Sequence, residues 1–276
     1  FLDTAKVYAD WLPGEKSSSE KTIGRWLRQR GNRADVIVAT KGAHPELATM
    51  HIPRLSPAEI AFDLHQSLRN LGADTIDLYW LHRDDPARPV EEIMDTMQEQ
   101  VQAGKIRYYG CSNWHTARLE AAQIYAARRG WTGFVANQMM WSCALVTPQA
   151  LPDPTMVAMD AAMWRYHQQS ELAAVPYSSQ ANGYFQRLAD GTVDQMSAHA
   201  RRLYEMPANV RRFARIQRLA AEHEVPVTAI VLAYLHSQPF PVFPVVGCRT
   251  LEQLYDSCHA ADVRLSPEEL AQVEAA

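Results

Sequence analysis

Two short apolar runs, Ile76-Asp-Leu-Tyr-Trp-Leu81 and Ile106-Arg-Tyr-Tyr-Gly-Cys-Ser112, decide how this chain is expected to fold. Aromatic and branched aliphatic side chains are frequent in both, which is typical of strands buried in a sheet. Residues 89–103 between them carry apolar side chains at helical spacing, and such a strand–helix–strand unit joins parallel strands. Similar runs predict further strands at residues 1–3, 36–41, 134–138, 172–177 and 242–246.

Helical stretches alternate with these strands. Ser17, Ser56 and Ser266 each precede a Glu by three residues, a pattern that predicts a capping box at a helix start. Besides 89–103, helices are expected at residues 56–71, 116–129, 154–169, 207–222 and 227–237. The polar segment 190–205 is expected to be a flexible loop.

The alternation predicts an α/β fold in which residues 1–276 form one domain, a (β/α)8 TIM barrel. A doubly wound sheet is the alternative, but its GxGxxG turn is absent from the sequence.

Composition narrows the range of functions. The net charge of −4 gives no basic surface for nucleic acid or for an acidic membrane. The four cysteines form no CxxC pair, so we expect neither a metal site nor a disulfide framework. Cysteines that stay reduced favour a cytoplasmic protein. The sequence contains no apolar run of about 18 residues that could span a membrane.

Polar residues stand at the ends of successive predicted strands, where barrel enzymes carry their chemistry. Asp3, Lys41 and His82 end three strands, and Tyr8 follows Asp3 in the next loop. A nearby ammonium would stabilise the phenolate of a tyrosine and ease its loss of a proton, while an aspartate would hold that ammonium charged. A histidine could then position a substrate oxygen. Singly, each residue has a structural explanation; together they predict proton delivery to a carbonyl group that receives hydride.

At this point the sequence resembles a known family. Phe1-Leu-Asp-Thr-Ala-Lys-Val-Tyr8, Val38-Ala-Thr-Lys41, Ile76–His82 and Gly104–Asn113 are similar, in this order, to motifs of the aldo-keto reductases. The resemblance implies a (β/α)8 barrel that binds NADPH without a Rossmann fold. It also implies catalytic roles for the four residues above, hydrogen bonds from Ser112, Asn113 and Gln138 to the nicotinamide carboxamide, and stacking of Tyr177 on the nicotinamide ring.

The resemblance extends to the segment Pro244–Leu254, which is similar to the family's adenosine-phosphate segment. It implies that Gly247 brings backbone amides to phosphate at a helix start, that Arg249 pairs with the 2′-phosphate of NADPH, and that Gln253 and Ser257 lie beside the adenine. Ser257 stands where many members have Asn. Tyr177-Ser-Ser-Gln-Ala-Asn-Gly183 departs from the usual Tyr-Ser-Pro-Leu-Gly, and Ser178, Gln180 and Asn182 are candidate pyrophosphate donors.

The beginning of the chain leads to a further expectation. Phe1-Leu-Asp3 reads as the end of a strand, and the family has another strand, and often a hairpin, ahead of this motif. We therefore expect the first barrel strand to be absent from this sequence and to be supplied by a missing segment or by another part or copy of the chain, because an open barrel exposes two sheet edges.

Trp11, Trp114 and Trp141 follow catalytic or cofactor motifs and are candidate walls of a substrate site. The predicted function is NADPH-dependent reduction of an aldehyde or ketone, sugar-like or aromatic, so the partner is a small carbonyl compound; the oligomeric state stays open. One alternative is a regulatory subunit that binds the cofactor with little turnover. Another is a barrel enzyme in which Lys41 forms a Schiff base, which a lysine held charged by Asp3 disfavours.

Overall fold

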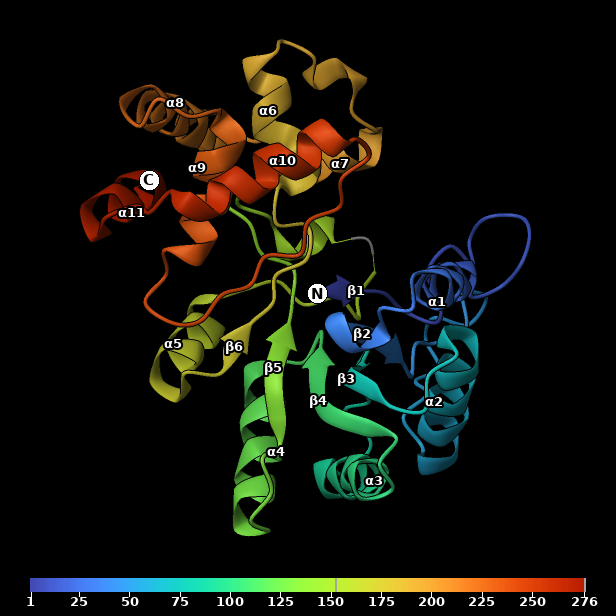
Figure 1. Ribbon diagram of the computed structural model, residues 1–276. Coiled ribbons are helices and arrows are strands. Elements are labelled where there is room, and N and C mark those ends of the chain that lie inside the picture. The colour runs from blue at the N-terminus through green and yellow to red at the C-terminus, as the bar shows by residue number, and fades with distance from the viewer. Residues whose placement is uncertain (152, 276) are drawn as a thin grey trace. The chain divides into compact units, whose positions relative to one another are not determined.

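The computed structural model describes residues 1–151 and 153–275 (Figure 1). Contacts along the chain divide it into two compact units, Phe1–Asn137 and Gln138–Ala276.

The first unit alternates strands and helices, as the sequence predicts. Figure 1 shows its helices α1 and α2 side by side. Its strands are β1 (Leu2–Asp3), β2 (Val38–Gly42), β3 (Ile76–Leu81), β4 (Ile106–Ser112) and β5 (Phe134–Gln138), of which Gln138 opens the second unit. Its helices are α1 (Ser18–Arg30), η1 (Arg33–Asp35), α2 (Pro57–Leu71), α3 (Val90–Gln102) and α4 (Thr116–Arg128).

The strands of this unit pair in sequence order, and β1 to β4 are parallel. Asp3 is opposite Ala39, and Lys41 is opposite Trp80. The backbone N–H of His82 donates to the carbonyl of Gly42 at 2.9 Å, so the ends of β2 and β3 are level. This register brings the carboxyl ends of β1, β2 and β3, and the polar residues there, to one edge of the sheet.

One glycine is needed for close packing beneath this edge. A Cβ atom on Gly42 would lie 1.8 Å from the hydroxyl of Tyr79 and 2.9 Å from Cβ of Asp63. Real Cβ atoms do not approach other atoms so closely, so only glycine lets these two buried side chains pack next to Lys41.

Two of the three predicted capping boxes form, at Ser56 and Ser266. The one predicted at Ser17 is wrong, although α1 does begin at Ser18. Ser17 has a left-handed backbone (φ 54°), and its N–H donates to Asp10 Oδ1 at 2.6 Å. Glu20 is fully buried and instead accepts hydrogen bonds from Thr40 and Asn70, so long-range contacts override the local pattern.

The second unit is mostly helical. Its helices are η2 (Pro148–Ala150), α5 (Ala161–Ser170), η3 (Ala181–Gly183), α6 (Tyr184–Ala189), η4 (Val193–Gln195), α7 (Ala198–Tyr204), α8 (Pro207–Glu222), α9 (Val227–His236), α10 (Leu251–His259), η5 (Ala260–Asp262) and α11 (Pro267–Glu274). The helix predicted from residue 154 starts only at Ala161, where Asp160 caps it. The segment 190–205 is not a simple loop, because α7 buries Leu203 and Tyr204 in the core of this unit.

The strand predicted at 172–177 is reduced to β6 (Ala173–Ala174), and the strand predicted at 242–246 does not form. A bridge joins Ala174 to Val242, and the N–H groups of Phe243 and Val245 donate to the carbonyls of Ala174 and Pro176. In the segment 172–177, Pro176 has no N–H to donate to the facing segment after Ala174, which explains the loss of regular strand structure. Among the described residues, no helix is long and apolar enough to cross a membrane.

Candidate active site

The centre of the candidate site is the side chain of Lys41, at the end of β2. It is fully buried, and its ammonium donates to Asp3 Oδ2 at 2.5 Å and to the carbonyl of Thr4 at 2.9 Å. Burial lowers the pKa of Lys41, but the charges of Asp3 and Tyr8 and hydrogen bonds to both outweigh it, so the pKa lies above its usual value. Lys41 is therefore a permanently charged cation at neutral pH.

Tyr8 lies directly against this cation. The ammonium of Lys41 is 4.7 Å from the centre of the Tyr8 ring. A turn after β1 places the tyrosine there, with its N–H donating to the carbonyl of Ala5 at 3.1 Å. The backbone of Lys6 donates to the carbonyl of Lys41 at 3.0 Å and ties this turn to β2. The arrangement can deliver a proton from a phenol beside a fixed positive charge.

His82 completes the group at the end of β3. Its ring meets the Tyr8 ring edge to face, with 5.8 Å between the ring centres. Burial, with the positive charges of Arg83 and Lys41 nearby, holds the pKa of His82 well below its usual value, so the ring is neutral. In the described part of the chain, its Nδ1 atom has no hydrogen-bond partner. All four predicted catalytic residues thus lie together in the first unit.

Ser112 and Asn113 lie beside this group, at the end of β4. Both are buried, and Asn113 has a left-handed backbone (φ 61°). Its side-chain amide donates to the carbonyl of His82 at 3.3 Å and to Ser112 Oγ at 3.0 Å. The predicted carboxamide-binding pair is therefore adjacent to the predicted catalytic histidine.

The other two predicted nicotinamide residues belong to the second unit. Gln138 is buried at the end of β5, and Tyr177 is half-buried after β6. The N–H of Tyr177 donates to the carbonyl of Met139 at 2.9 Å, and a bridge joins Tyr177 to Met140. Tyr177 is thus anchored to the segment that directly follows Gln138.

The second unit also brings the two predicted phosphate segments together. Gln180 Nε2 donates to Ser257 Oγ at 3.3 Å, and Ser179 Oγ donates to the carbonyl of Val245 at 2.5 Å. Ser178, Asn182 and Gly183 all have positive φ values (53°, 54° and 77°). Such left-handed residues turn backbone N–H groups toward a concave face, a feature of anion-binding loops.

The start of α10 differs in detail from what the sequence suggests. The side chain of Gln253 turns back and accepts a hydrogen bond from the N–H of Arg249 at 2.8 Å, while Thr250 Oγ1 accepts from the N–H of Gln253 at 3.2 Å. Two backbone donors near the helix start are therefore already used. The side chain of Arg249 and the position of Gly247 are exposed.

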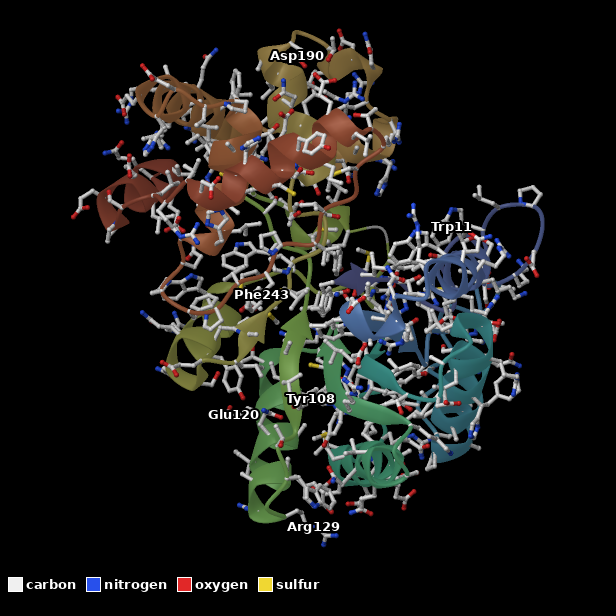
Figure 2. The ribbon with its side chains drawn as sticks, viewed as in Figure 1. Trp11, Tyr108, Glu120, Arg129, Asp190 and Phe243 are labelled. Carbon is white, nitrogen blue, oxygen red and sulfur yellow. The ribbon has the colours of Figure 1, made fainter. Side chains whose placement is uncertain are left out.

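The three candidate tryptophans lie in different environments. Trp11 is 62% exposed, and Figure 2 shows it on the loop that follows the Tyr8 turn; its ring centre is 6.3 Å from that of Tyr8. Trp114 is fully buried against Phe134, with its Nε1 donating to the carbonyl of Arg83, so it offers no surface to a substrate. Trp141 lines a cavity of about 680 Å³ in the second unit.

Comparison with known proteins identifies the family. A sequence model described as the aldo/keto reductase family matches residues 1–276. The chain belongs to the aldo/keto reductase family. It is 31% identical to the aryl-alcohol dehydrogenase [NADP(+)] of Phanerodontia chrysosporium, over 98% of this chain and 70% of that relative. It is 29% identical to norsolorinic acid reductase of Emericella nidulans, over 99% of this chain and 67% of that relative.

Solved aldo/keto reductases share the fold. The aldo/keto reductase of Klebsiella pneumoniae, solved in complex with NADP and acetate, has a TM-score of 0.69 at 25% identity, covering 99% of this chain and 78% of the other. The thermostable aldo-keto reductase Tm1743 has a TM-score of 0.68 at 22% identity, covering 99% and 80%. The predicted α/β fold of the (β/α)8 type is thus confirmed, and this aldo/keto reductase is an oxidoreductase.

Two residues of this aldo/keto reductase that contact or neighbour predicted site residues, one in each unit, were not predicted from the sequence. The His44 ring lies 4.7 Å from the His82 ring, centre to centre, and its Nδ1 is 2.6 Å from the carbonyl of Pro45. Its place two residues after the end of β2 was a signal that could have found it. Ser179 is buried and joins the two phosphate segments, and only its position between the predicted donors Ser178 and Gln180 pointed to it.

Proposed function

We propose that this aldo/keto reductase reduces an aldehyde or ketone to the alcohol with NADPH, and that Tyr8 donates the proton. The observation that carries the proposal is the Lys41 ammonium, buried between the carboxylate of Asp3 and the ring of Tyr8. A buried ion pair contributes little to stability by itself, because desolvation offsets most of its attraction. The placement of this ion pair against the phenol of Tyr8, at a strand end, is better explained by a catalytic role.

The residues fit the cofactor. The exposed guanidinium of Arg249 suits the 2′-phosphate of NADPH, and the left-handed loop at Ser178 and Asn182 suits the pyrophosphate. Ser112 and Asn113 would bind the carboxamide beside His82, and Gln138 and Tyr177 are the further residues assigned to the nicotinamide. When bound, the cofactor supplies the hydride. The aldo/keto reductase of Klebsiella pneumoniae, which has the same fold and was solved in complex with NADP, supports this assignment.

The chain's own residues account for the proton. The Tyr8 hydroxyl donates its proton to the carbonyl oxygen as negative charge develops there, and Lys41 stabilises the phenolate that is left. Asp3 keeps Lys41 charged and fixed in place. Neutral His82 can donate one N–H to the same carbonyl oxygen and so orient it. Because Lys41 stays protonated, it is a poor nucleophile, which disfavours Schiff-base chemistry.

We further propose an aromatic carbonyl compound as the substrate. An aryl-alcohol dehydrogenase and a norsolorinic acid reductase are among the relatives. In this chain, the exposed Trp11 ring beside Tyr8 offers an apolar surface on which an aryl ring can pack.

Product analysis tests the function directly. The protein is incubated with NADPH and benzaldehyde, and NADPH absorbance and benzyl alcohol are measured together. We expect one alcohol formed for each NADPH consumed, with slower consumption when NADH replaces NADPH. NADPH that quenches the protein's fluorescence but is never consumed, across aryl aldehydes, aldoses and keto-sugars, would instead identify a cofactor-binding regulator.

A further inference from the structure

A second buried carboxylate, Asp63 of α2, lies just below the candidate catalytic group. It is 1% exposed, and both of its oxygens are bonded. Oδ1 is 2.8 Å from the ammonium of Lys6, and Oδ2 accepts from the N–H of Ala43 at 2.9 Å. Arg54 completes the set with a two-pronged contact, at 3.0 Å to Oδ2 and 3.1 Å to Oδ1.

These partners belong to the two loops that carry the site. Lys6 stands two residues before Tyr8, in the turn after β1. Ala43 stands two residues after Lys41 and directly before His44, and it has a left-handed backbone (φ 58°). Arg54 also donates to the carbonyl of His44 at 3.2 Å. One carboxylate therefore holds the turn that bears the proposed proton donor and the segment that follows the proposed cation.

The position of this carboxylate leaves little freedom. Its Cβ is one of the atoms that a side chain at Gly42 would strike, so α2 and β2 are in close contact there. The ammonium of Lys6 has a second contact, since it lies 5.7 Å from the ring centre of Phe62. A two-pronged arginine contact adds directional rigidity that a single bond lacks.

We propose that Asp63 is a positioning residue for the reductase site: it locks the Lys6 turn to the Ala43–His44 segment, and so fixes Tyr8 and His44 against Lys41 and His82. The inference rests on the proposed function. A shift of about 1 Å in a catalytic group can cost about 10²-fold in rate. We therefore expect Asp63→Asn, which keeps the shape but loses the charge, to lower kcat for benzaldehyde about 10²-fold.

The chain offers a matched control in Asp77, at the start of β3. It is also buried, it accepts from a backbone N–H, that of Val38 at 2.9 Å, and like Asp63 it pairs with two basic side chains, here Arg33 and Arg107. Its partners lie at the opposite ends of the strands from the candidate site. Asp77→Asn should lower the melting temperature much as Asp63→Asn does, yet leave kcat within about twofold of the parent protein.

The experiment compares the parent protein, Asp63→Asn and Asp77→Asn in three readouts: kcat and KM for benzaldehyde, the Kd for NADPH, and the imidazole NMR signals of His44 and His82. We expect only Asp63→Asn to move both imidazole signals and to lower kcat, with the Kd for NADPH nearly unchanged. Imidazole signals and kcat that stay at parental values in folded Asp63→Asn would overturn the proposal.

The imidazole signals also separate this inference from the proposed function. If the parent protein consumes no NADPH with any carbonyl compound, the proposed reductase function is refuted. The imidazole signals of His44 and His82 would still show whether Asp63 fixes the Ala43–His44 segment. Should Asp63→Asn fail to fold, Lys6→Met replaces it, because methionine has a stem of similar length but lacks the ammonium that pairs with Asp63 and lies over the Phe62 ring. We expect Lys6→Met to move the His82 signal and lower kcat; parental values for both would overturn the proposal.

Discussion

Replacing Lys41 by Met isolates the ion pair at the centre of the site. Met matches the length of the lysine stem and leaves little empty space, so the main losses are electrostatic. The Asp3 carboxylate, 8% exposed at its side chain, loses its ammonium partner, and the carbonyl of Thr4 loses a donor. Breaking a buried pair in this way typically costs about 3–5 kcal/mol. This is a large part of the stability of about 5–15 kcal/mol that is usual for a folded domain.

A double-mutant cycle tests this reasoning. In Lys41→Met/Asp3→Asn, no uncompensated charge remains, so we expect the double variant to recover about 2 kcal/mol relative to Lys41→Met. Urea unfolding followed by circular dichroism measures each corner of the cycle. Strictly additive losses, with the double variant the least stable of the four proteins, would refute a coupled pair. Lys105→Met, at a half-buried lysine directly before β4, serves as the control.

Three further predictions follow from the described contacts. The unfolding free energy should fall as the pH drops from about 7.5 to about 5.5. In the unfolded state His82 takes up a proton near pH 6.5, whereas in the folded state its lowered pKa keeps the ring neutral. The change of unfolding free energy with pH, measured by urea unfolding, should be smaller in His82→Gln. Arg249→Ala should raise the Kd for NADPH by about 10- to 100-fold and barely alter that for NADH, as fluorescence titration would measure, since only NADPH carries the 2′-phosphate. Gly42→Ala should destabilise the protein by about 3 kcal/mol or more in thermal melts, and Tyr79→Phe should relieve part of that loss by removing the hydroxyl 1.8 Å from the new Cβ.

The sequence predicted most clearly the candidate site residues that stand at the carboxyl ends of strands. Asp3, Lys41 and His82 could be predicted as neighbours because parallel strands in sequence order bring successive carboxyl ends to one edge. Helix α8 matches its predicted bounds, since Pro207 marks its first residue and its apolar spacing is regular.

Other features depend on contacts that no local pattern contains. The Ser17 capping box failed because Thr40 and Asn70, far along the chain, bind Glu20. Asp63 reads as an ordinary helix residue, and its role is visible only once Lys6 and Arg54 are folded onto it. The roles assigned to Gln138 and Tyr177 stay predictions.

The central claim is that Tyr8 gives up its proton beside a buried cation. Single-turnover oxidation of bound NADPH by benzaldehyde, in the parent protein, Tyr8→Phe and the control Tyr108→Phe, tests it most directly; Tyr108 lies exposed on β4 (Figure 2). We predict that Tyr8→Phe binds NADPH normally but oxidises it about 10²- to 10⁴-fold more slowly, while Tyr108→Phe matches the parent protein. Equal oxidation rates in all three proteins would contradict the account.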